Sequence, residues 1–241
     1  MISIKNLSCS FSKEFILKDI SLELQSHVTV LGANGSGKST FAKALCGLNK
    51  YEGEIYIAKQ NLQNLSLVQR AKTIAYIPTK LEVYDKYITV EEFVLLSRFA
   101  YKKSYLDYTQ KDRDLVEKNL NFLAITHLKH HTMEALSSGE QQLVLIASAL
   151  TQQSDVIIFD EPTANLDPLN SKVIAQHIKT LKKQHQIILI THDLHLAHYI
   201  DSEVLFVKNS SIEHYKEGIF TDAMLQKLYG VKFTNLVVEY A

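Results

Sequence analysis

The sequence predicts an α/β fold in which a helical lobe is inserted into a strand-rich core. Two observations carry this prediction. Short apolar runs alternate with amphipathic segments over much of the chain, whereas between residues 89 and 150 the apolar residues recur at helical spacing. Continuous apolar runs that alternate with amphipathic segments are typical of buried parallel strands covered by helices.

The predicted strands concentrate in two parts of the chain. Strand-like runs occupy residues 2–7, 20–24, 28–31, 54–57 and 74–77, with a helix predicted to open at Lys38. After the helical lobe, apolar runs at residues 156–159, 187–190 and 204–207 alternate with amphipathic segments at 169–183 and 194–200. Because no Pro/Gly/Ser-rich linker interrupts the chain, we expect one domain over residues 1–241, with the helical subdomain at approximately residues 85–150.

Composition argues against several classes of protein. The 26 Lys and Arg residues balance 26 Asp and Glu residues, so no net charge attracts the chain to nucleic acid or to an anionic lipid surface. Cys9 and Cys46 are too few and too far apart for a disulfide framework or a zinc knuckle. The longest apolar runs fall short of the roughly 20 residues that cross a bilayer, and the first residues lack a signal-peptide core. We therefore expect a cytoplasmic protein whose membrane role requires a partner.

A phosphate-binding loop is predicted between the apolar run at 28–31 and the helix that opens at Lys38. Its residues fit the pattern G-x-x-x-x-G-K-[ST], with the strand before it and the helix after it that the pattern requires. Backbone N–H groups of the loop and the helix N-terminus would face the phosphates, Lys38 would supply a cation, and Ser39 would supply a hydroxyl to Mg²⁺. The predicted ATP-binding residues are Gly32, Ala33, Asn34, Gly35, Ser36, Gly37, Lys38, Ser39 and Thr40.

Two acids end the apolar run at 156–159. Asp160 and Glu161 would lie at the carboxyl edge of the sheet, where α/β folds bind ligands. Because successive residues cannot share one face of a strand, Asp160 is suited to the Mg²⁺ shell and Glu161 to orienting the water that attacks the γ-phosphate.

Further segments resemble the motifs of one family. Leu136-Ser137-Ser138-Gly139-Glu140 resembles the LSGGQ signature of ABC ATPases, Asn165-Leu166-Asp167 resembles their D-loop, and Thr191-His192-Asp193 resembles their H-loop. Phe11 stands where the family stacks an aromatic ring on adenine. The resemblance covers essentially the whole chain, and it implies a phosphate-loop ATPase core with an N-terminal antiparallel β-subdomain and an inserted helical subdomain.

The resemblance also implies a mechanism. Two copies would close head to tail, with ATP between the phosphate loop of one and the signature of the other. ATP binding across the dimer falls to Ser137, Ser138, Gly139, Glu140 and Asp167, and the catalytic residues are Glu161, His192 and Lys38. The implied ligands are ATP and Mg²⁺. The implied partners are a second copy, integral membrane permease subunits and, indirectly, a periplasmic or surface substrate-binding protein, with the chain peripheral on the cytoplasmic face of the membrane.

Thr79 departs from the family pattern. Most members carry a glutamine here, which touches Mg²⁺ or the lytic water and relays closure to the membrane subunit, so Thr79 is the doubtful member of the predicted metal site. Threonine is too short for the same reach; either coupling or turnover is altered, or Lys80 or a water substitutes. The signature departs too, with Ser138 for the second glycine and Glu140 for glutamine.

The helical lobe begins with residues 89–98, which look like the corresponding segment of ATPases serving importers of iron-siderophore, haem, cobalamin or zinc. This favours an importer, with an iron chelate as the first candidate cargo. The alternatives are an exporter ATPase and a nucleotide-binding subunit with weak or partner-dependent hydrolysis. A chromosome or DNA-repair ATPase would need coiled coils, zinc modules or a basic face, and a small-molecule kinase has no use for the signature.

Overall fold

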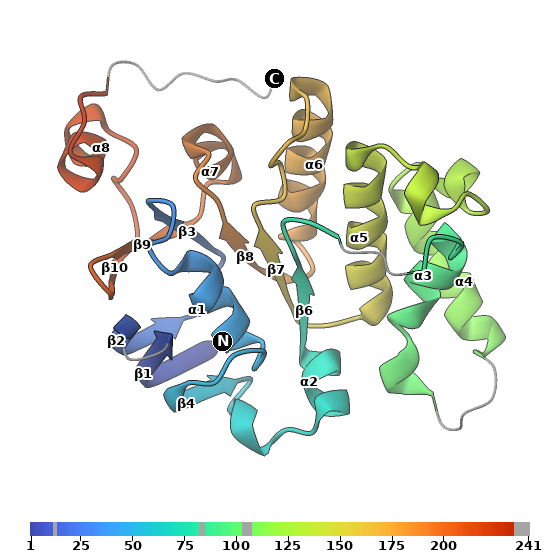
Figure 1. Cartoon of the computed structure of the whole chain (residues 1–241), viewed down its shortest axis with the longest axis horizontal. Helices are drawn as coiled ribbons and strands as arrows, with labels where there is room; N and C mark the ends of the chain where they lie inside the picture. The colour runs from blue at the N-terminus through green and yellow to red at the C-terminus, as the bar shows by residue number, and fades with distance from the viewer. Residues whose placement is uncertain (12–13, 82–84, 103–107, 234–241) are drawn as a thin grey trace.

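The computed structural model describes residues 1–11, 14–81, 85–102 and 108–233, and these residues form two sheets and a group of helices (Figure 1). The first sheet is antiparallel, with strand order β2-β1-β4-β5. The second has the order β10-β9-β3-β8-β7-β6, in which only the edge strand β10 is antiparallel to its neighbour. The strands are β1 (Ile2–Phe11), β2 (Glu14–Leu24), β3 (Val28–Gly32), β4 (Glu52–Ile57), β5 (Gln60–Asn61), β6 (Ile74–Ile77), β7 (Val156–Asp160), β8 (Gln186–Ile190), β9 (Glu203–Lys208) and β10 (Ser211–Tyr215).

Helices connect the strands of the second sheet and build the helical lobe. The α-helices are α1 (Lys38–Leu45), α2 (Leu67–Thr73), α3 (Val90–Leu96), α4 (Gln110–Phe122), α5 (Ser138–Gln152), α6 (Pro168–Leu181), α7 (Leu194–Ile200) and α8 (Asp222–Tyr229). The 3₁₀ helices are η1 (Leu62–Asn64), η2 (Phe99–Tyr101), η3 (Thr126–Leu128) and η4 (Met133–Ala135). The predicted α/β class, N-terminal antiparallel sheet and inserted helical lobe are confirmed.

The central strands are apolar because both of their faces are covered. Every residue of β3 and β7 is buried, as expected for parallel strands with layers on each side. Their register brings the predicted site residues to one edge: Gly32 pairs with Val207 on β9, and Asp160 pairs with Ile190 on β8. The phosphate loop and the two acids therefore leave the sheet at the same carboxyl edge.

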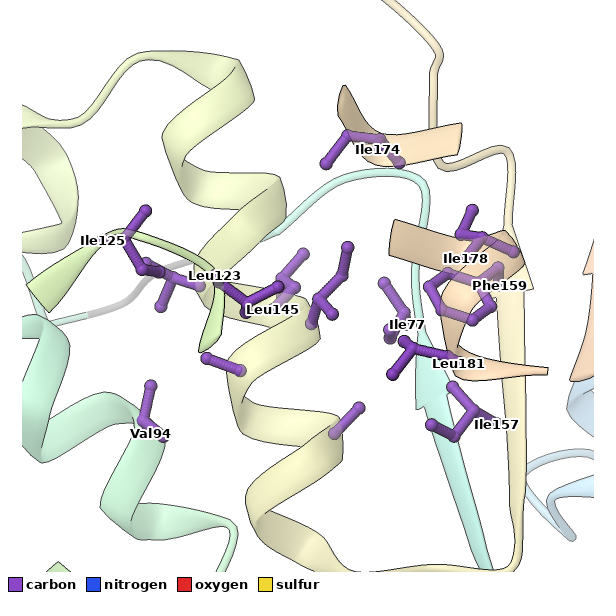
Figure 2. Close-up of a cluster of buried hydrophobic side chains, with 14 of the residues drawn as sticks. Ile77, Val94, Leu123, Ile125, Leu145, Ile157, Phe159, Ile174, Ile178 and Leu181 are labelled. Carbon is purple, nitrogen blue, oxygen red and sulfur yellow. The ribbon is translucent and has the colours of Figure 1, made fainter. Parts of the chain in front are cut away.

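The helical lobe shares one core with the second sheet. Figure 2 shows Leu145 of α5 between Val94 and Leu123 of the lobe on one side and β6 and β7 on the other. This cluster of buried side chains includes residues of α3, α4 and α5 in the lobe and residues of β6, β7 and α6 beside it. Helix α5 thus carries both the signature turn and the packing that fixes the lobe to the sheet.

Four helices begin with a capping box, a pattern formed by residues that are close together in the sequence. In each, a Ser or Thr accepts a hydrogen bond from the backbone N–H three residues later, and the side chain at that later position bonds back. Such reciprocal capping satisfies two backbone donors that the first turn leaves free. The pairs are Ser66 with Gln69, Thr89 with Glu92, Thr109 with Asp112 and Ser137 with Glu140.

Some elements differ from the sequence prediction. Strand β2 begins at Glu14 rather than at residue 20, and α2, β10 and α8 were not predicted. Helix α2 has no buried residue and β10 is an edge strand, so neither shows the apolar periodicity on which the prediction depends. No helix in the described parts of the chain is long and apolar enough to span a membrane.

Candidate nucleotide-binding site

The phosphate loop links β3 to α1 through a backbone path that requires glycine. At Gly32, φ is +149°, and a Cβ would lie 2.5 Å from the Val207 carbonyl oxygen of β9. Gly37, the residue that precedes α1, has φ +108° and would place a Cβ 2.9 Å from the Ile16 side chain. The loop is therefore confined between β9 and the N-terminal sheet, and side chains are excluded at both of its ends.

Lys38 is the buried cation of this loop. Only 6% of the residue is exposed, and its Nζ donates to the carbonyl oxygens of Gly32 at 2.9 Å and Ala33 at 3.0 Å. Burial lowers the pKa of Lys38, and the nearby Glu161 and Asp160 carboxylates oppose that shift. A compact ammonium held in this way is available to an anionic ligand seated in the loop.

Asp160 ends β7 with both carboxylate oxygens hydrogen-bonded. Ser39 Oγ, from the first turn of α1, donates to Oδ1 at 3.1 Å, and Tyr76 OH, from β6, donates to Oδ2 at 2.7 Å. The residue is 2% exposed. Burial, and then the bond to Asp160, raise the pKa of Tyr76, so the tyrosine hydroxyl remains a donor. The Ser39 hydroxyl and the Asp160 carboxylate form the hard oxygen set that Mg²⁺ prefers, so the residues present fit that ion.

Glu161 follows Asp160 in a left-handed backbone conformation, with φ +51°. Its Oε2 accepts hydrogen bonds from Thr191 Oγ1 at 3.3 Å, His192 N at 3.3 Å and His192 Nδ1 at 2.8 Å. The conformation turns the Glu161 side chain away from that of Asp160 and toward the end of β8. Among the described residues none donates to Glu161 Oε1.

The predicted signature residues form the first turn of α5. Ser137 Oγ donates to Glu140 Oε2 at 2.7 Å, and Ser137 N donates to the same oxygen at 2.8 Å. These bonds lower the pKa of Glu140. Ser137 and Ser138 are exposed, and they stand at a helix N-terminus, which attracts anions.

The signature turn packs against the predicted D-loop of the same chain. Gly139 is buried, and a Cβ there would lie 2.7 Å from the Asn170 side chain. Asn170 in turn donates through Nδ2 to Asp167, which caps α6 by accepting from the backbone of Leu169 and Asn170. The start of α5 and the start of α6 therefore lie against each other at the Asn170 side chain.

The structure brings part of the predicted site together and leaves part of it apart. Lys38, Ser39, Asp160, Glu161 and His192 share the carboxyl edge of the second sheet. In Figure 1, α1 lies on the left and α5 on the right, with β8, β7 and α6 between them. The signature residues of one copy therefore stand away from its own phosphate loop.

Other predicted residues are placed as follows. Ala33, Asn34 and Gly35 at the loop tip are exposed, and so is Thr79, two residues beyond the end of β6. The backbone of Phe11 ends β1, but its side chain lies outside the described part of the structure.

Sequence reasoning missed two residues that contact the site. Tyr76 and Asn170 bond to Asp160 and Asp167 respectively. Thr191 was named only as part of the H-loop segment, and its bond to Glu161 was not predicted. The available signal was weak: Tyr76 is a hydroxyl-bearing residue within an otherwise apolar strand, and buried hydroxyls need partners.

Comparison with known proteins identifies a family whose model matches this chain and several proteins of similar sequence. A family model described as "ABC transporter" matches residues 17–164. A zinc import ATP-binding protein of Buchnera aphidicola is 32% identical over 86% of this chain and 81% of its own length. A manganese transport system ATP-binding protein of Halalkalibacterium halodurans is 28% identical over 95% of this chain and 92% of its own. A petrobactin import ATP-binding protein of Bacillus anthracis is 28% identical over 93% and 83%.

Solved structures share the fold. The structure of a putative metal-chelate type ABC transporter in an inward-facing conformation aligns with a TM-score of 0.83 at 24% identity, over 96% of this chain and 89% of that one. The dimeric structure of a bacterial ABC transporter cassette aligns with a TM-score of 0.77 at 26% identity, over 90% of this chain and all 100% of that one.

Proposed function

The chain belongs to the ABC transporter family as an ATP-hydrolysing cassette, and we propose that two copies of it drive import through separate membrane permease subunits. One observation carries the proposal: the phosphate loop and the exposed signature turn, which are the two predicted phosphate-binding segments, lie apart on one chain. A second copy placed head to tail would bring the signature turn of each copy to the phosphate loop of the other.

In the proposed site each residue has a distinct task. Lys38 would leave the Gly32 and Ala33 carbonyls and bind the β- and γ-phosphate oxygens, and His192 would contact the γ-phosphate. Ser39 and Asp160 would hold Mg²⁺, which when bound neutralises phosphate charge. The N-terminus of α5 from the second copy, at Ser137 and Ser138, would face the same phosphate from the other side.

Hydrolysis requires a water molecule in line with the γ-phosphorus. Glu161 would orient that water through Oε1 and accept its proton, while Thr191 and His192 hold Oε2. The water oxygen bonds to the γ-phosphorus as the bond from phosphorus to the β,γ-bridging oxygen breaks, which gives ADP and phosphate. Loss of the shared phosphate would remove the contact that joins the two copies, so the dimer would reopen.

The dimer can be tested with a variant that binds ATP without hydrolysing it. Glu161→Gln should sediment as a dimer with ATP and as a monomer with ADP. Glu161→Gln combined with Ser138→Glu is the matched control, because a carboxylate on the exposed signature turn would repel the triphosphate of the second copy. The double variant should bind ATP yet stay monomeric. A monomer in all conditions, or a dimer unaffected by Ser138→Glu, would refute the arrangement.

A membrane partner is supported by apolar side chains exposed on the helical lobe. Tyr87 is 86% exposed, and Leu96 and Phe99 are 52% and 65% exposed. Tyr87 and Leu96 line one surface pocket, and exposed apolar side chains that gather on a surface suit a protein contact. We propose that the permease binds this surface from the membrane side, which places the chain on the cytoplasmic face as a peripheral subunit. Fractionation with and without the coexpressed permease would test the location.

The cargo we propose is a metal or a metal chelate, with an iron chelate as first candidate. Residues 89–98 resemble the importer ATPases that serve such compounds, and the relatives named above are a zinc, a manganese and a petrobactin system. Vesicles that contain the permease, this subunit inside and a substrate-binding protein outside should take up labelled cargo only with ATP in the lumen. Uptake of zinc or manganese without uptake of an iron chelate would change the assignment.

A further inference from the structure

We propose that Tyr76 is a positioning residue for the Mg²⁺ ion of the nucleotide site, because its hydroxyl fixes the carboxylate of Asp160. This inference rests on the proposed function, in which Asp160 and Ser39 hold that ion. None of the motifs described above includes Tyr76.

Strand register explains how Tyr76 reaches Asp160. In the parallel pair β6 and β7, Tyr76 lies opposite Ile158. Residues 158 and 160 of β7 face the same side of the sheet because side chains alternate along a strand. The long Tyr76 side chain therefore extends along that face from β6 to the end of β7, where its hydroxyl lies 2.7 Å from Asp160 Oδ2.

The hydroxyls of Tyr76 and Ser39 bind different oxygens of the Asp160 carboxylate. Tyr76 binds Oδ2, and Ser39 binds Oδ1 at 3.1 Å. With Oδ2 engaged, rotation of the carboxylate is restricted and Oδ1 stays directed at Ser39, the other predicted ligand. A shorter or apolar side chain at position 76 would leave Oδ2 of an almost completely buried carboxylate without this donor. Groups that orient a metal ligand in this way typically change metal affinity by roughly 10- to 100-fold when removed.

The test separates metal binding from nucleotide binding. Binding of a non-hydrolysable ATP analogue is measured over a series of Mg²⁺ concentrations, and Mn²⁺ bound with the nucleotide is counted by electron paramagnetic resonance. Tyr76→Phe should raise the Mg²⁺ concentration needed for half-maximal effect by about tenfold and leave metal-free nucleotide affinity unchanged. Tyr101→Phe is the matched control, since it removes a hydroxyl that donates to the Gln152 carbonyl oxygen at 3.0 Å in the helical lobe.

The possible outcomes are distinct. An unchanged Mg²⁺ dependence in Tyr76→Phe, or an equal partial loss of nucleotide binding with and without metal, would overturn the role of Tyr76. Failure of the unaltered protein to bind Mg-ATP would instead reject the proposed function. Metal-free nucleotide binding shows that a variant is folded, and Tyr76→Leu, which also lacks the hydroxyl, supplies the same test should the phenylalanine variant not fold.

Discussion

The phosphate-loop half and the signature half of the predicted site are built in opposite ways. In the first, Lys38 and Asp160 are buried, and the partners of Asp160, Ser39 and Tyr76, come from segments that are distant in sequence. In the second, Ser137 and Ser138 are exposed, and the bonds of the turn link residues three positions apart. The first half is fixed by the tertiary fold, whereas the second is an N-terminal helix cap presented to solvent.

This difference indicates how each half contributes to ligand binding. Buried charges bonded to fixed partners are preorganised for a charged ligand and cost free energy when a partner is removed. An exposed helix cap contributes little to ligand binding by itself, and it contributes more when another surface covers it and excludes water. Substitutions in the first half should therefore act on one copy, and those in the second should act mainly on the pair.

The largest expected effect is at Glu161. Glu161→Gln removes the proton acceptor but keeps the shape of the side chain, so phosphate release should fall by about 10²- to 10⁴-fold while ATP binding is retained. Phosphate-release kinetics and equilibrium ATP binding measure the two quantities. Hydrolysis at the unaltered rate would remove Glu161 from the mechanism.

The next largest effect is expected at the buried ion pair between Arg98 and Asp112, which connects α4 to the C-terminal end of α5 in the helical lobe. Arg98 Nε donates to Asp112 at 2.8 Å, and Arg98 Nη1 donates to the Thr151 carbonyl oxygen at 3.0 Å at the end of α5. Arg98→Ala leaves a buried carboxylate unpaired and should lower the free energy of unfolding by about 3–5 kcal/mol, measured by urea denaturation. Arg113→Ala, at an exposed position on α4, should have little effect.

The contribution of Asp112 should depend on pH in the acid range. Burial alone would raise the pKa of Asp112, but bonds from Thr109 and Arg98 hold that pKa below the ordinary value of an aspartate. Because the folded-state pKa is lowered, the stabilisation is fully present above the unfolded-state pKa and is lost as the pH falls through the folded-state pKa. The difference in stability between the native chain and Arg98→Ala should be constant above about pH 4 and shrink below it. A constant difference down to pH 2 would contradict this assignment.

Substitution of Lys38 should have a smaller effect, and that effect should be on ATP binding and not on the stability of the fold. Lys38→Ala removes a charge-assisted contact worth about 1.5–3 kcal/mol, so ATP binding should weaken roughly tenfold to a hundredfold. Calorimetry measures the affinity, and Lys43→Ala on the exposed face of α1 is the control. Unchanged affinity in the Lys38 variant would refute its role.

The smallest change in stability is expected at Ser137, and it tests the comparison most directly. Ser137→Ala removes the cap of α5 at a cost of about 0.5–2 kcal/mol. Ser66→Ala removes the same kind of cap from α2 and should cost a similar amount. Only the Ser137 variant should also weaken ATP-driven association, measured by sedimentation in the Glu161→Gln background. Equal association in both variants would mean that the signature turn is an ordinary helix cap.

Sequence alone determined the features that depend on local order along the chain. Gly32, Gly37 and Lys38 could be assigned because the loop needs fixed spacing between a strand and a helix, and Ser137 could be placed at a helix start because capping acts within one turn. The α/β class followed because burial on both faces makes strands continuously apolar.

Only the tertiary structure decided which side chains meet across the sheet. The bonds from Tyr76 to Asp160, from Thr191 to Glu161 and from Arg98 to Asp112 depend on strand register and helix packing. No periodicity in the sequence encodes these pairings. The separation of the signature turn from the phosphate loop was likewise set by where α5 packs, because the direction of a helix relative to a distant loop is fixed by the core it shares with other elements and not by its own residues.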